Sequence, residues 1–208
     1  MILVAHGVAG EELSWIGVNA PDRISGLVYL DAAYDRTHVG EEAAIAARIP
    51  TQAPQPNDMT SVSSVVAWMS RNVGGPIPEA EVRQMADVGP DGRVIGPRSA
   101  GSGQPSVLAQ LTRVDPAGIR VPVLALYAPR TSAAALPGCQ APEVPSVREA
   151  CGALYEWTTQ QLNRSQQLFA GIPQARIADV PGASSFMFLS NPIEVTAALK
   201  AFASEVAR

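Results

Sequence analysis

The stretch MILVAHGVAGEELSWIGVNAPDRISGLVYLD, residues 1–31, decides the fold class. Residues 2–5 form a short apolar run of the kind found in buried parallel strands, and Gly7 ends it. Residues 11–19 predict a helix, and residues 24–30 predict a second buried strand. A strand, a turn, a helix and a second strand in this order predict a right-handed βαβ unit within a parallel sheet.

Strand character returns in the last part of the chain. VPVLALYA at residues 121–128 is the clearest buried strand, and residues 175–180 predict another, with a helix over residues 146–170 between them. Asn191 is predicted to cap the N-terminus of a final helix. The inward face of this helix is expected to consist of apolar residues at helical spacing: Val195, Leu199, Phe202 and Val206.

Residues 36–116 differ in character from the sequence on either side of them. Residues 41–48, 61–72 and 79–86 predict helices, Pro- and Gly-rich loops lie around them, and no strong strand is evident. We therefore expect an α/β core, made of residues 1–35 and 117–208, in which helices flank a mainly parallel sheet. The region between is expected to form a mostly helical cap over one end of that sheet.

Composition argues against several classes of function. The 208 residues are 47% hydrophobic and 16% charged, with a net charge of −4 and no basic run that could follow a phosphate backbone, so nucleic-acid binding is not expected. The longest apolar stretches fall short of the ~20 residues that cross a bilayer, so no membrane span is expected. No cationic start with a cleavage site indicates a secretory signal, so the default location is the cytoplasm.

The two cysteines, Cys139 and Cys151, leave two interpretations open. They lie twelve positions apart, and a disulfide between them would close a short loop and indicate an oxidising compartment. The alternative is a pair of free thiols, one in a Pro-rich loop and one in a helix. The sequence does not decide between them, because a disulfide depends on a geometry that sequence does not give.

Residues 5–9, AHGVA, join the first strand to the first helix and carry the main motif. In α/β-hydrolases this junction is the nucleophile elbow, where small residues flank a sharp turn. AHGVAGEELSWIG…APDRISGLVYLDAAYDRT resembles the run GHSxAGEE…PDRVxGLVYLDAAYDR of esterase- and epoxide-hydrolase-like members of this family, and VPGASSFMFLSNP resembles their VPGANHYxFLSNP. The resemblance covers nearly the whole chain and implies a partial α/β-hydrolase fold, corresponding to the C-terminal two-thirds of a complete member.

The departures from that pattern bear on activity. Gly7 stands where the family has its nucleophilic serine, and Ser185 stands where it has its histidine. Asp31, after the second strand, matches a position where some relatives hold the acid, and it is either a leftover acid or a structural residue. Acyl transfer needs a hydroxyl to attack and an imidazole to take its proton, so the resemblance implies loss of the Ser-His-Asp mechanism. The Val8 N–H remains a candidate oxyanion donor.

Other side chains are weaker candidates. We interpret His6 mainly as a packing residue beside the elbow, although it is the one local base that a different catalytic set could use. His6 is also a candidate wall of a pocket beneath the cap, together with aromatic and Met side chains for which core packing is the alternative: Trp68, Met69, Phe186 and Met187. The acids show no metal-ligand spacing with His or Cys, and no metal or other cofactor is expected.

Three hypotheses follow for function. The chain is a degenerate or truncated hydrolase, related to carboxylic-ester and epoxide hydrolases; or it binds a small apolar, ester-like ligand without catalysis; or it is active through a non-standard set of residues. A complete family member carries further strands before the elbow. A chain of these residues alone is therefore expected to expose the edge of strand 2–5, through which two copies could pair as a homodimer.

Overall fold

Four parallel strands form the central sheet of the computed structural model, which describes residues 1–36, 38–50, 54–73, 76–97, 114–140 and 142–207. Their order across the sheet is β1-β2-β5-β6. Their bounds are Ile2–His6 for β1, Gly26–Leu30 for β2, Val123–Tyr127 for β5 and Ala175–Asp179 for β6. All four coincide with runs that the sequence predicts as strands, and every residue of β2 and β5 is buried.

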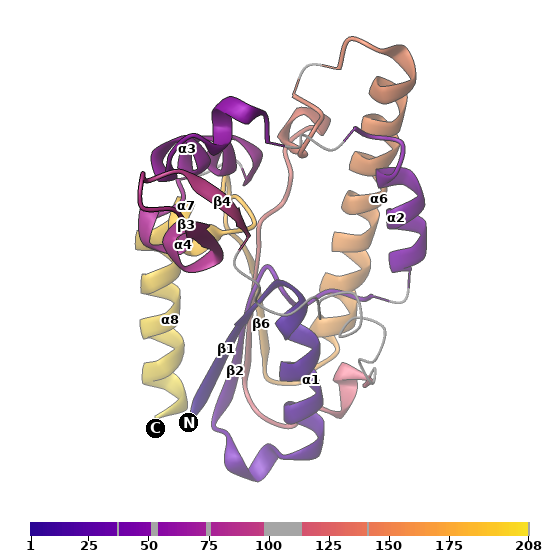
Figure 1. The fold of residues 1–208 in the computed structure, drawn as a ribbon. Helices are drawn as coiled ribbons and strands as arrows, with labels where there is room; N and C mark the ends of the chain where they lie inside the picture. The colour runs from indigo at the N-terminus through magenta and orange to yellow at the C-terminus, as the bar shows by residue number, and fades with distance from the viewer. Residues whose placement is uncertain (37, 51–53, 74–75, 98–113, 141, 208) are drawn as a thin grey trace.

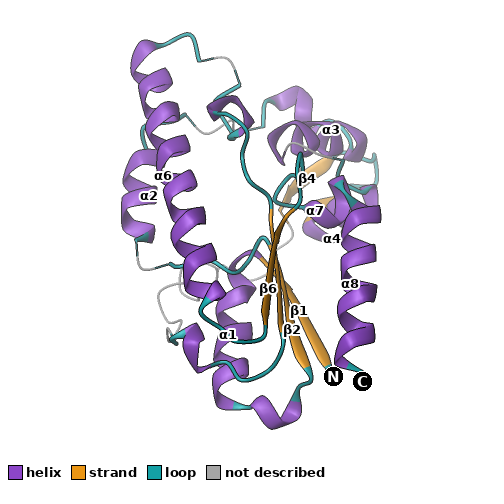
Figure 2. Cartoon of the chain, turned by 180° about the vertical axis from the view of Figure 1, so that it is seen from behind, coloured by secondary structure: helices purple, strands orange, loops and turns teal. Residues whose placement is uncertain are grey.

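Helices cover both faces of this sheet, as Figures 1 and 2 show. α1 (Gly10–Asn19) and α6 (Pro145–Ala170) lie on one face, and α8 (Pro192–Val206) lies on the other. Side chains alternate along each strand, so Leu27 and Tyr29 of β2 face the first layer and Val28 faces α8. Burial on both sides explains why β2 and β5 are continuous apolar runs rather than alternating ones.

α8 presents the predicted apolar face to the sheet. Val195 and Phe202 are buried, and Leu199 and Val206 pack against the same cluster. Asn191 precedes the helix as predicted, but its side chain makes no capping bond. Its Oδ1 instead accepts a hydrogen bond from the Ser190 hydroxyl at 2.9 Å, so that prediction was wrong in its chemistry.

The region between β2 and β5 consists of two groups of elements. α2 (Val39–Ala46) packs against α6, whereas α3 (Val62–Val73) and α4 (Glu79–Met85) form a separate apolar cluster beyond the carboxyl ends of the strands (Figure 1). An antiparallel hairpin of β3 (Ala86–Val88) and β4 (Val94–Pro97) belongs to the second group. The sequence did not predict these strands, because three or four residues are too few to show a periodicity.

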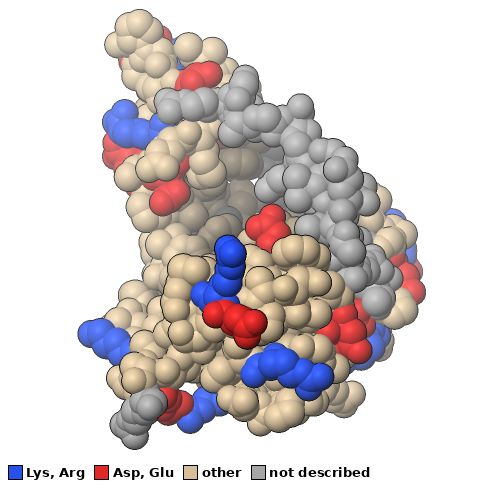
Figure 3. Space-filling view, turned by 90° about the horizontal axis from the view of Figure 1, so that it is seen from below, with Lys and Arg blue, Asp and Glu red and all other residues tan. Residues whose placement is uncertain are grey.

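Short helical segments complete the described chain. α7 (Met187–Ser190) precedes α8, and the 3-10 turns span Gly7–Ala9, Pro21–Arg23, Pro56–Met59, Pro116–Gly118 and Ala133–Ala135. No helix in these described ranges is both long and apolar enough to cross a membrane. On the face that Figure 3 shows, acidic and basic side chains lie interspersed, and no stripe of one sign crosses it.

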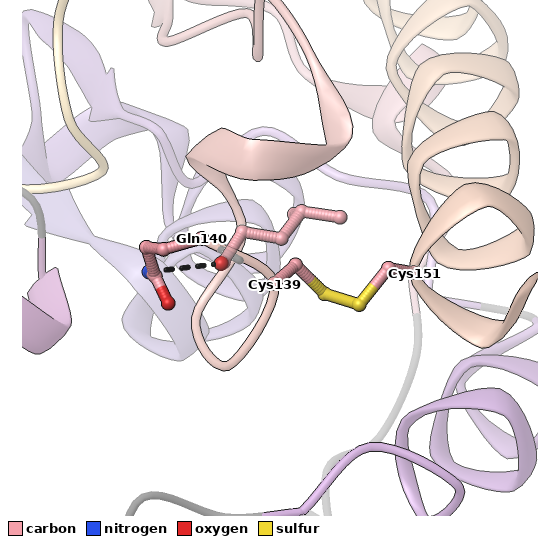
Figure 4. Close-up of a disulfide and its surroundings, with 4 residues drawn as sticks. Cys139, Gln140 and Cys151 are labelled. Carbon is pink, nitrogen blue, oxygen red and sulfur yellow. Dashed lines mark hydrogen bonds between the residues drawn. A yellow bond between two sulfur atoms is a disulfide. The ribbon is translucent and has the colours of Figure 1, made fainter. Parts of the chain in front are cut away.

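Two further features bear on the open alternatives. Cys139 and Cys151 are joined by a disulfide that ties the loop after β5 to α6, beside the hydrogen bond from Gln140 to the Leu136 carbonyl (Figure 4). Both cysteines are buried. β1 lies at an edge of the sheet, where the Val4 side chain is half exposed. Pairing of two copies through this edge stays a prediction.

Candidate functional site

The three positions singled out by the sequence meet at the carboxyl ends of the strands. His6 pairs with Leu30 in the register of β1 and β2, so Gly7 and Asp31 follow neighbouring strands. Ser185 comes from the loop between β6 and α7, more than 150 residues further along the chain. Gly7, Asp31 and Ser185 line one cavity of about 770 Å³.

Gly7 has the backbone conformation of an elbow but offers no functional group. Its φ is +61°, in the left-handed region that glycine adopts with little penalty. A Cβ built there would meet nothing within 4 Å, so a side chain at this position would project into open cavity space. Close packing follows at Gly10, where a Cβ would lie 2.1 Å from the Ala32 carbonyl oxygen. The turn is therefore closely packed at Gly10, whereas the space beside Gly7 is unoccupied by any side chain.

Asp31 is a fully engaged carboxylate. It is 6% exposed, and among the described residues it is the non-glycine residue with positive φ, at +48°. The Tyr34 hydroxyl donates to Oδ1 at 2.6 Å, the Ala128 N–H donates to Oδ1 at 3.3 Å, and the Ser185 hydroxyl donates to Oδ2 at 2.5 Å. Burial, and then the charge of Asp31, raise the pKa of Tyr34 well above its ordinary value, so Tyr34 stays a proton donor.

Ser185 and His6 meet through the backbone rather than as a catalytic pair. His6 Nε2 lies 3.0 Å from the Ser185 carbonyl oxygen, which only accepts, so the ring carries its proton on Nε2. The His6 ring packs against Phe186 and Phe188, with centroids 4.9 and 5.3 Å away. His6 is not among the residues that line the cavity. The imidazole is thus held in an aromatic cluster beside the site.

The cavity lies between the two groups of elements that follow β2. Trp68 of α3 lines it, whereas Met69 packs within the α3–α4 cluster and Met187 is fully buried in the core under α8. Phe186 also lies outside the lining. Much of the wall is apolar and comes from the loop after β5, from the segment after α2 and from α6: Ala128, Pro129, Leu136, Pro137, Ile49, Pro50, Leu154 and Leu162.

No protein-family model and no curated protein sequence matches the chain. Solved structures do match. E-2-(acetamidomethylene)succinate hydrolase aligns with a TM-score of 0.57 and 18% identity over 100% of this chain and 66% of its own. MenH from S. aureus aligns with a TM-score of 0.54 and 14% identity over 100% of this chain and 69% of its own. Both are α/β-hydrolase fold proteins. This chain has the α/β-hydrolase fold.

The chain spans about two-thirds of the length of these α/β-hydrolase fold structures. Identities this low establish the shared fold, while activity has to be argued from the site itself. In an α/β-hydrolase the elbow side chain attacks, a histidine takes its proton and an acid orients the histidine. At the three positions that the sequence resemblance indicates for these groups, this chain has Gly7, Ser185 and Asp31. Val8 lines the cavity next to Gly7, where its N–H stays a candidate oxyanion donor.

The structure adds charged and polar residues that the sequence did not single out. Tyr34, Arg36, Glu42 and Arg130 all line the cavity. Tyr34 lies within the run LDAAYDR that carries the resemblance, three positions after Asp31, so its place near the carboxylate could have been inferred. Arg130 follows the predicted strand 121–128, whose carboxyl end reaches the same edge as Gly7 and Asp31, and this placement was the available signal.

Proposed function

We propose that this chain is a catalytically degenerate relative of the carboxylic-ester and epoxide hydrolases, without turnover through a Ser-His-Asp mechanism. The observation that carries the proposal is the 2.5 Å hydrogen bond from the Ser185 hydroxyl to Asp31 Oδ2, across from an elbow with no side chain. A hydroxyl bound to a carboxylate does not replace an imidazole, because it does not hold and release a proton near neutral pH. Without a nucleophile and a base, Asp31 has no partner to orient.

Hydrolysis of nitrophenyl acetate tests this proposal. The wild-type chain is expected to hydrolyse the ester no faster than Asp31→Ala, because the carboxylate serves no catalytic step. His6→Ala is the second comparison, since His6 is the nearest imidazole to the site. Turnover above the buffer rate that Asp31→Ala abolishes would contradict the proposal, and turnover that His6→Ala abolishes would instead support a non-standard catalytic set.

A second candidate function is the binding of a small apolar, ester-like molecule without catalysis. It is favoured by the cavity itself, whose volume of about 770 Å³ falls within the usual range for small-molecule sites of ~300–1,000 Å³. Its walls combine apolar surface with a small number of polar groups, which is the usual composition of such sites. Loss of the catalytic groups leaves this space open, because neither Gly7 nor Ser185 fills it.

Thermal shifts with a matched pair of variants test the second candidate. A ligand that binds only the folded state raises the melting temperature, and the shift grows with the ratio of ligand concentration to Kd. Ala46 lines the cavity from α2, whereas Ala44 lies exposed on the same helix and outside the lining. Ala46→Trp is expected to abolish the shifts that small esters give and Ala44→Trp to keep them. Equal shifts in the two variants, or none in the wild type, would count against this function.

A further inference from the structure

Arg130 differs from the other arginines near this site. It follows the carboxyl end of β5, lines the cavity and is partly buried. Within the described ranges, no hydrogen bond or ion pair engages its guanidinium. Arg36, in the same cavity wall, is paired with Glu11 at 3.4 Å. Arg48 precedes the lining residue Ile49 in the chain and is paired with Glu149 at 3.0 Å. Arg130 is therefore a cation that faces the cavity with its donors unused.

Asp31, the acid beside Tyr34, does not pair with Arg130. The charge of Arg130 acts on Tyr34, where it lowers the pKa against the larger effects of burial and of Asp31, so Arg130 lies at the Tyr34–Asp31 end. The Asp31 oxygens already accept hydrogen bonds from a tyrosine hydroxyl, a serine hydroxyl and a backbone N–H. These three donors disperse the charge of Asp31, which limits its repulsion of a second anion.

The chemistry around Arg130 defines what would complement it. A guanidinium presents donors in a planar fork that fits the two oxygens of a carboxylate, and a partly buried cation gains most from a partner of opposite charge. The neighbouring wall is apolar, with Ala128 and Pro129 before it in the chain and Leu136 and Leu162 in the same lining. A ligand suited to this end therefore combines one carboxylate with an apolar body.

We propose that the cavity binds a small monocarboxylate, with its carboxylate paired to Arg130 and its apolar chain against the wall between the loop after β5 and α6. This inference rests on the ligand-binding function proposed above and names the chemical class of the ligand. Arg130 acts here as a specificity-determining residue and takes no part in a reaction.

Calorimetric titration with hexanoate and with its methyl ester tests the proposal. The two probes share an apolar chain and differ in charge. The wild type is expected to bind hexanoate more tightly than the ester, and this preference should weaken as salt is added. Arg130→Met should weaken hexanoate binding by about 10-fold or more while leaving the ester unchanged. Arg130→Lys should keep part of the preference, because the charge remains without the fork.

Arg120→Met is the matched control, since Arg120 is exposed and precedes the opposite end of the same strand. It should bind both probes as the wild type does. Ester binding without any preference for hexanoate, or hexanoate binding that survives Arg130→Met in a variant with an unchanged melting temperature, would overturn this inference and leave the ligand-binding function standing. Failure of the wild type to bind either probe would overturn the inference, and absence of thermal shifts with every ester tested would overturn the function as well.

Discussion

Gly7 and Asp31 occupy equivalent places, each directly after one of two neighbouring parallel strands and each with a left-handed backbone. For an L-amino acid this conformation costs about 1–2 kcal/mol, although aspartate tolerates it better than most residues, and glycine adopts it with little penalty. At Asp31 three hydrogen bonds offset the strain, whereas at Gly7 there is neither strain nor a side chain. The comparison therefore contrasts a buried, hydrogen-bonded carboxylate after one strand with a turn that carries no side chain after the neighbouring strand.

The largest expected effect comes from introducing the serine and the histidine that the proposed degeneracy leaves out. In Gly7→Ser/Ser185→His the new hydroxyl would project into the open cavity, and the imidazole would stand beside Asp31 Oδ2. We expect nitrophenyl acetate hydrolysis to rise by about 10²-fold over the wild type, because a positioned base contributes ~10²–10⁴-fold. Initial rates over a substrate series measure it.

The single variants are the controls for that experiment. Gly7→Ser and Ser185→His are each expected to stay at the wild-type rate, because nucleophile and base act as a unit. A third variant, Gly7→Ser/Ser185→His/Asp31→Ala, should lose most of the gain if Asp31 orients the new imidazole. A double variant that folds and stays at background would show that Asp31 is not arranged for catalysis.

Asp31→Ala is expected to have the largest effect on stability. Removal of the Asp31 carboxylate leaves the Tyr34 and Ser185 hydroxyls without their acceptor, and alanine at this position still has to adopt positive φ. Unsatisfied buried donors cost about 1–3 kcal/mol each, so we expect the free energy of unfolding to fall by about 2–4 kcal/mol. Urea unfolding measures it. Asp31→Asn, which retains an acceptor oxygen, should lose less, and equal losses would show that the hydrogen bonds are not what offsets the strain.

Much of this fold follows from local sequence patterns, whereas the contacts of the site do not. The strands, α1 and the apolar face of α8 are apparent in runs of a few residues, because burial on two faces or on one helical stripe leaves a periodic record. The bond between Ser185 and Asp31 joins residues 154 positions apart and depends on the loop after β6. The disulfide and the β3–β4 hairpin also depend on tertiary packing that short segments do not encode.

The candidate residues also divide into those that the sequence could place in the site and those that it could not. Resemblance indicated the positions of Gly7, Asp31 and Ser185, and the structure brings all three to one cavity. Met187 has the same apolar character as a wall residue, yet it lies in the core, because the turn that precedes α8 directs it toward the sheet. For Arg130 the sequence offers only its place after the predicted strand 121–128, at the edge of the sheet that Gly7 and Asp31 share. Glu42 could not be assigned to the cavity from sequence, since nothing on a short helix indicates which charged side chain faces inward.

Gly7→Ala tests the elbow half of the comparison through the backbone alone. No atom lies within 4 Å of the new Cβ, so the change isolates the penalty of φ +61°. We expect a loss of about 1–2 kcal/mol in the free energy of unfolding. Gly152→Ala is the control, because Gly152 lies in α6 with equally open space and helical backbone, and there alanine should stabilise by about 0.5–1 kcal/mol. If both variants changed the free energy of unfolding in the same direction, the left-handed backbone at position 7 would not be what penalises an added side chain.

The smallest expected effect concerns Glu42, a second acid in the same cavity that contrasts with Asp31. No described residue donates a hydrogen bond to Glu42, and burial raises its pKa from the ordinary 4.5, an effect that Arg36 opposes. The folded chain therefore holds this proton to higher pH than the unfolded chain. The contribution of Glu42 to stability is expected to fall as pH rises above about 4.5 through the raised value, and Glu42→Gln should remove that contribution.

Urea unfolding at pH 4 and at pH 7 measures this contrast between the two acids. Glu42→Gln should match the wild type at the lower pH and exceed it at the higher pH, where the wild type has to bury a charge without a donor. Glu156→Gln is the control, because Glu156 lies exposed on α6 and should show no such gain. If Glu42→Gln instead lost stability at pH 7, the charged form of Glu42 would have a favourable partner in the folded chain. Glu42 would then resemble Asp31, whose carboxylate has hydrogen-bond donors.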